Sequence, residues 1–96
     1  MNKITLKSAL SKIWALVNLS SQVALTTDQE NELSAAIDSL ESEWDEAEIF
    51  ARKAAYVAMC ARMLLAALTA RPPRKPSARK MLIEDCQLLL RHLGSN

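Results

Sequence analysis

A chain of 96 residues has room for one domain, and half of its residues are apolar, which is enough for a hydrophobic core. The single Gly and the three Pro all follow residue 71, whereas a sheet protein of this length needs Gly, Asn and Pro in several tight turns. A net charge of +1 excludes strong attraction of the whole molecule to nucleic acid. We therefore predict one all-α domain over residues 1–96, folded as a three- or four-helix bundle.

Residues 5–22 form the first predicted helix, because apolar residues recur there at spacings of three and four. The apolar stripe consists of Leu6, Leu10, Ile13, Trp14 and Val17, with Ala9 and Leu16 at its edges. Thr5 is the predicted N-cap. The lysines and the tryptophan of this segment would also suit a helix lying on an anionic membrane. The other predicted helices have matching apolar arcs, so we expect packing into the bundle and not membrane association.

The second predicted helix covers residues 28–44. Thr27 and Glu30 have the spacing of a capping box, in which two side chains satisfy free amide groups reciprocally. The apolar stripe consists of Leu33, Ile37, Leu40 and Trp44, beside Ala36 and Ala47. The first residue that would break a helix is Pro72, so one long helix could continue to residue 70.

Such a helix would be about 65 Å long, against a diameter of about 26 Å for a compact domain of this size. We therefore expect a long central helix that bends near residues 42–45, with Asp45 and Glu48 as a second capping pair. The alternative is an elongated, dimeric molecule with a straight helix.

The third predicted helix covers residues 46–70 and is apolar on every side from Ala54 onward, with Arg62 as the exception. A helix without a polar face must be enclosed by its own chain or by a second copy, so we expect a homodimer. We expect the stem of Arg62 to lie along the core while its guanidinium reaches water. A buried pair with an acidic residue of the second helix is the alternative.

Residues 71–76 form a basic, proline-rich linker, because proline cannot continue a helix. The fourth predicted helix covers residues 78–93, with Ser77 as its N-cap. Its stripe consists of Leu82, Cys86, Leu89 and Leu93, widened by Ile83 and Leu90. Gly94 occupies the place where a left-handed residue commonly ends a helix.

Charge is segregated along the chain. Nine of the eleven acidic residues lie between Asp28 and Glu48 without an intervening Lys or Arg, and the segment from Arg52 to Lys80 holds eight basic residues and no acidic one. The two blocks could pair within the fold or across a dimer. Alternatively, an acidic face binds a basic partner protein. The residues of this predicted acidic face are Glu32, Asp38, Glu41, Asp45 and Glu48.

The third interpretation assigns phosphate binding to the basic segment 71–80. Its candidate contacts are Arg71, Arg74, Lys75, Arg79 and Lys80. Such a cluster would give salt-sensitive, sequence-nonspecific binding of nucleic acid. The segment lacks interleaved aromatic residues for base stacking, which makes this the second choice.

Catalytic patterns are absent from the sequence. The sequence places no nucleophile and no second metal ligand at a useful spacing from the lone histidine, His92, and it has no phosphate-binding glycine loop, so we predict no enzyme, no metal and no cofactor. Cys60 and Cys86 resemble core thiols more than a disulfide, which favours a cytoplasmic setting. The sequence thus predicts a non-enzymatic helical interaction module, such as a small regulator, inhibitor or adaptor, whose partner is another protein.

Overall fold

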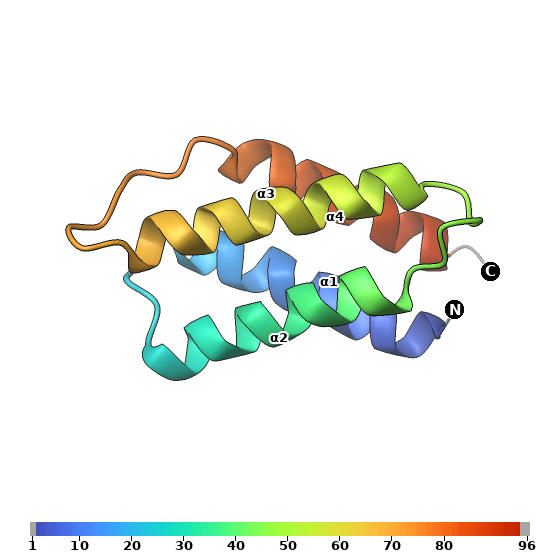
Figure 1. The fold of residues 1–96 in the computed structure, drawn as a ribbon, viewed down its shortest axis with the longest axis horizontal. Helices are drawn as coiled ribbons and strands as arrows, with labels where there is room; N and C mark the ends of the chain where they lie inside the picture. Colours follow the sequence, from blue (N-terminus) through green and yellow to red (C-terminus); the bar gives the residue numbers. More distant parts are fainter. Residues whose placement is uncertain (1, 95–96) are drawn as a thin grey trace.

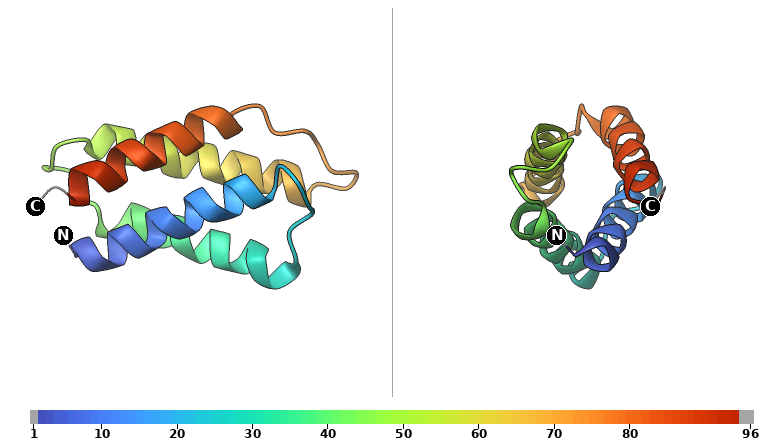
Figure 2. Two further views of the ribbon diagram at one scale, coloured as in Figure 1. Left: turned by 180° about the vertical axis from the view of Figure 1, so that it is seen from behind. Right: turned by 90° about the vertical axis from the view of Figure 1, so that its right-hand side faces the viewer.

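The computed structural model describes residues 2–94 and contains four helices in that range. They are α1 (Lys3–Leu19), α2 (Thr27–Glu43), α3 (Ala51–Thr69) and α4 (Arg79–Gly94). Each helix packs against the next along the chain, and α4 packs back against α1 (Figure 1). Viewed from the end, the helices surround one central core, as expected for an up-and-down bundle (Figure 2). The predicted all-α class and bundle architecture are confirmed, with four helices rather than three.

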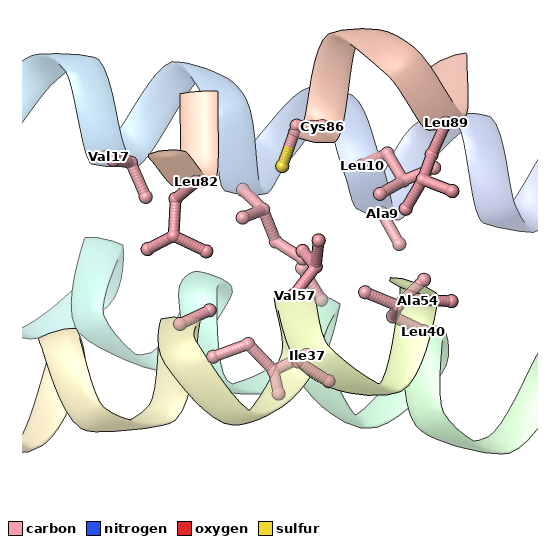
Figure 3. Packing of buried hydrophobic residues seen from close by; sticks show 14 of the residues in the cluster. Ala9, Leu10, Val17, Ile37, Leu40, Ala54, Val57, Leu82, Cys86 and Leu89 are labelled. Carbon is pink, nitrogen blue, oxygen red and sulfur yellow. The ribbon is translucent and has the colours of Figure 1, made fainter. Parts of the chain in front are cut away.

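The core is one cluster of apolar side chains to which all four helices contribute (Figure 3). The predicted stripes of α2 and α4 are buried, as are the thiols of Cys60 and Cys86, which are free. In α1 the prediction holds for every stripe residue except Trp14, whose side chain is 37% exposed. Trp14 lies at the edge of the stripe, about 70° from the direction shared by Leu6, Leu10, Ile13 and Val17, and this edge of α1 is open to solvent.

The first two helices begin at caps one to three residues from the predicted ones. Asn2, not Thr5, caps α1, since its side-chain oxygen accepts a hydrogen bond from the Thr5 backbone N–H at 3.1 Å. The capping box of α2 joins Thr26 and Gln29, with N···O distances of 2.9 and 3.1 Å, in place of Thr27 and Glu30. Adjacent pairs in this sequence have the same spacing and equivalent hydrogen-bonding groups, so the pattern alone leaves the register open by one residue.

The chain leaves helical geometry between Glu43 and Ala51, which confirms the predicted interruption and excludes the continuous straight helix. Asp45 and Glu48 do not cap a helix. They form a turn, in which the Glu48 N–H donates to the Asp45 carbonyl at 3.0 Å and the Asp45 carboxylate accepts from the Ala47 N–H at 3.0 Å. Phe50 precedes α3 with a left-handed backbone, φ 64°, so α3 starts five residues later than predicted.

Residues 70–78 connect α3 to α4. The Arg74 N–H donates to the Ala67 carbonyl at 2.8 Å, which fixes the linker beside the last turns of α3. Ser77 does not cap α4 as predicted, because α4 begins at Arg79. The N–H of Leu82 donates to the carbonyl of Ala78, which directly precedes the helix. Gly94 is the last residue of α4 and does not have a positive φ, so the predicted left-handed end is wrong.

Candidate functional site

The outer face of α3 is apolar and exposed to solvent. Tyr56, Met59 and Met63 are 47%, 49% and 64% exposed. Their spacing of three and four residues places them on one line along the helix, here called the α3 stripe. A single copy of the chain therefore does not enclose α3 on all sides, and enclosure by a second copy, the alternative that the sequence left open, stays a prediction. A helix at the corner of a four-helix bundle has neighbours on two sides only, so its outer side needs another cover.

A groove of about 540 Å³ lies between α3 and the linker, and the three residues of the α3 stripe are among those that line it. Its floor contains the buried side chains of Cys60, Leu64 and Ala67, and its outer wall consists of residues 74–78. This groove, here called the α3 groove, forms where the linker returns along α3 before it enters α4. The hydrogen bond from the Arg74 N–H to the Ala67 carbonyl holds the linker beside the helix. Two exposed cations, Arg74 and Lys75, stand on its rim.

The side of the groove that Tyr56 lines carries no charge. Tyr56 interacts with Cys60, and hydrogen bonding to this neighbour is the first cause of a raised pKa of the tyrosine hydroxyl. The phenol therefore keeps its proton at neutral pH and presents an apolar ring with one polar tip. An apolar floor, two thioethers and a cationic rim together favour an apolar ligand with negative charge.

The loop at the opposite end of α3, residues 44–50, has the reverse character. It carries three exposed carboxylates, Asp45, Glu46 and Glu48, followed by exposed Ile49 and Phe50. Phe50 contacts α4 through an edge-on approach to the ring of His92, with ring centroids 5.0 Å apart. This segment, here called the acidic loop, and the linker lie at the two ends of α3 (Figure 1).

The five predicted acidic-face residues are all exposed, but the structure does not place them in one free patch. Asp38 and Glu41 both accept hydrogen bonds from the guanidinium of Arg62 on α3. Glu32 lies toward α1, where it lines a shallow hollow with Lys12. Asp45 and Glu48 belong to the acidic loop.

Arg62 combines features of both sequence-based alternatives. Its guanidinium is at the surface, as expected, and it also pairs with α2, although the pair is not buried. These bonds to two carboxylates raise the pKa of Arg62, so its charge is retained. The acidic and basic blocks therefore pair within the fold at this point.

The predicted phosphate contacts are also divided. Arg71 donates to the carbonyls of Thr69 and Ala70 at 3.2 and 3.1 Å, and Arg79 donates to Ser20 at 3.1 to 3.3 Å. Arg74 and Lys75 stand on the rim of the groove, and Lys80 is exposed on α4.

Between residues 2 and 94, no three residues among His, Cys, Asp and Glu are grouped so that they could hold a metal ion. Burial and the neighbouring Asp85 raise the pKa of the Cys86 thiol to about 12. None of the helices in the described range combines the length and hydropathy that a membrane crossing requires.

Searches of known protein families, curated proteins and solved structures yield no match to this chain.

Sequence reasoning misses the α3 stripe as a site, because the apolar pattern alone predicts that its residues are enclosed. The observation that could have found it is the all-round apolar character of residues 54–70, which exceeds what two neighbouring helices cover.

Proposed function

We propose that this chain is a non-enzymatic helical interaction module and that the α3 stripe and groove form its protein-binding surface. The observation that carries the proposal is the exposure of Tyr56, Met59 and Met63 beside an apolar groove. Exposed apolar side chains scattered singly are normal, but a contiguous group beside a groove is typical of interaction sites. Methionine side chains are flexible and polarisable, so they adapt to partners of different shapes.

The partner surface would be an apolar segment with acidic residues. Its side chains would occupy the groove over Leu64 and Ala67, while its carboxylates would meet Arg74 and Lys75 on the rim. Helix-in-groove recognition by an amphipathic segment uses this combination. Of the predicted acidic face, Asp45 and Glu48 lie in the acidic loop at the beginning of α3 and would extend this surface, whereas Asp38 and Glu41 are engaged by Arg62.

Nucleic-acid binding by the basic segment 71–80 is the weaker alternative. Arg71 and Arg79 are held by hydrogen bonds to the protein itself, which leaves Arg74, Lys75 and Lys80 for phosphates. Fewer phosphate contacts give weaker and less salt-dependent binding. The two free, buried cysteines support a cytoplasmic setting for the module, since disulfides form in oxidising compartments.

Site-specific photocrosslinking in cells tests the proposal. A photoreactive phenylalanine analogue would replace Met63 in one variant and Ser11, exposed on α1, in a matched control. We expect discrete protein adducts from position 63 and none from position 11. Absence of adducts at position 63, or equal adducts at both positions, would contradict the assigned surface.

A further inference from the structure

The two ends of α3 have opposite charge and complementary shape. At the beginning of α3, the acidic loop projects Ile49 and Phe50, 63% and 42% exposed, among three carboxylates. Toward its end, the apolar groove along α3 has Arg74 and Lys75 on its rim. An acidic segment with projecting apolar side chains is the chemistry that this groove favours, and the chain itself carries one.

Both features lie on the side of the bundle that α3 shares with α4. Phe50 packs against His92 of α4, and Lys53 Nζ lies 3.5 Å from Asp85 Oδ1 of α4. The linker that walls the groove leads directly into α4. One face therefore contains the acidic loop at one end, the groove that the α3 stripe lines, and the rim cations Arg74 and Lys75.

We propose that a second copy of this chain binds this face, with the two α3 helices antiparallel and the acidic loop of each copy over the groove of the other. The inference rests on the proposed function and names the partner. A two-fold axis between Met59 and Cys60 produces this arrangement, because it places Tyr56 of one copy opposite Met63 of the other. Such an interface is self-complementary and closes as a dimer.

The register along α3 agrees with this axis. The axis places residue 50 of one copy at the level of residue 69 of the other. The cationic rim of the groove lies near that level, because the Arg74 N–H donates to the Ala67 carbonyl. A parallel pairing would place rim cations against rim cations and carboxylates against carboxylates, which disfavours that orientation.

Charge and area both suit a second copy. At the acidic end the three carboxylates outnumber the one nearby exposed arginine, Arg52. The bundle is 41 Å long and 20 to 23 Å across. One such face is comparable with the roughly 800 Å² per partner that a standard interface buries. A foreign acidic peptide in the groove would leave the exposed Ile49 and Phe50 uncovered, whereas a second copy covers them together with the groove.

The mass of the purified full chain in solution, from light scattering and sedimentation at about 50 µM, is the first measurement. We expect twice the chain mass of 10.6 kDa. Met63→Glu should yield monomers with an unchanged helical circular-dichroism spectrum, because it places a charge in the apolar interface, opposite Tyr56 of the other copy. Lys12→Glu, on exposed α1, is the matched control and should remain dimeric.

A charge exchange tests the antiparallel geometry. Lys75→Glu and Glu48→Lys should each weaken dimerisation about tenfold or more, through repulsion in both symmetric contacts. Mixing the two variants should restore dimers, because each of the two contacts then joins opposite charges. A purely structural role for either residue would not produce recovery on mixing.

Two results would overturn the inference: a chain mass of 10.6 kDa at 50 µM, or variants that remain equally weak after mixing. A monomer that still gives protein adducts at position 63 would leave the interaction function intact and remove self-pairing. A monomer without adducts at that position would remove both proposals.

Discussion

Arg62 and Glu41 form an ion pair that joins the middle of α3 to the last turns of α2, and Asp38 shares the same guanidinium. The pair explains how the most apolar helix of the chain contains an arginine at its centre. The side chain leaves the core along the edge of α3 and reaches the acidic block of α2. All three groups are exposed, so the bonds orient α3 relative to α2 more than they stabilise the fold.

Replacement of Arg62 by Met should therefore have a small effect on stability. We expect the free energy of unfolding to fall by at most about 1 kcal/mol at low salt, since exposed ion pairs contribute little. The difference from the parent chain should decrease in 1 M NaCl, where screening is strong. Urea denaturation at low salt and in 1 M NaCl measures this difference in the free energy of unfolding, with Lys12→Met as the surface control. A loss of several kcal/mol would mean that the guanidinium is structurally essential.

The register of the α2 cap can be tested with two neighbouring threonines. Thr26→Ala removes the side-chain oxygen that accepts from the Gln29 N–H, and should lower the free energy of unfolding by about 1 kcal/mol. Thr27→Ala, within the first turn, should change it by a few tenths of a kcal/mol at most. Thermal or urea denaturation of the two variants gives the comparison. The reverse order of effects would restore the Thr27–Glu30 box that the sequence predicts.

Burial, not side-chain size, should decide the cost of truncation in α1. Leu10 is fully buried, so Leu10→Ala should cost about 2–5 kcal/mol through lost contacts and a residual cavity. Trp14 is larger but partly exposed, and Trp14→Ala should cost less than Leu10→Ala. Urea unfolding curves of both variants provide the test, and a larger loss for Trp14→Ala would contradict the orientation of α1.

Cys86 should make the fold less stable at alkaline pH. In the folded protein, burial first and Asp85 second raise the pKa of this thiol to about 12, against about 8.5 for an unfolded cysteine. Between these values the unfolded chain releases a proton that the folded chain keeps, so stability decreases as pH rises. The contribution of this thiol to the free energy of unfolding is fully present below about pH 8, and about 1–2 kcal/mol of it is lost by pH 10.

The Cys86→Ala variant isolates that contribution. Its free energy of unfolding should decline less between pH 8 and pH 10 than that of the parent chain. Between pH 6 and pH 8 the two pH profiles should run parallel, whatever the offset from the lost side-chain volume. Parallel profiles over the whole range would show that the thiol does not couple to folding.

The helices and most of the core could be predicted from sequence because both follow from local periodicity. Leu33, Ile37 and Leu40 recur at helical spacing, and the structure buries all three. The ends of the helices were less certain, since caps depend on single hydrogen bonds that neighbouring residues can equally supply. The left-handed backbone at Phe50 has no composition signature, because glycine and asparagine are the residues that usually adopt it.

The candidate site could be predicted only in part. Charge segregation along the chain is visible in sequence, but the engagement of Asp38 and Glu41 by Arg62 depends on how α2 and α3 meet. The α3 stripe was invisible for a related reason. Periodicity identifies which residues share a face of a helix, whereas the number of neighbouring helices decides whether that face is covered.

The position of α3 has a consequence for how the molecule opens. This helix packs less extensively on its neighbours than α1, which lies between α2 and α4 with broad contacts to both. Elements with fewer buried contacts open in partial, reversible excursions that do not require global unfolding. Amide protons of α3 should therefore exchange with deuterated solvent earlier than those of α1. Anything that covers the α3 stripe, a second copy included, would slow that exchange selectively.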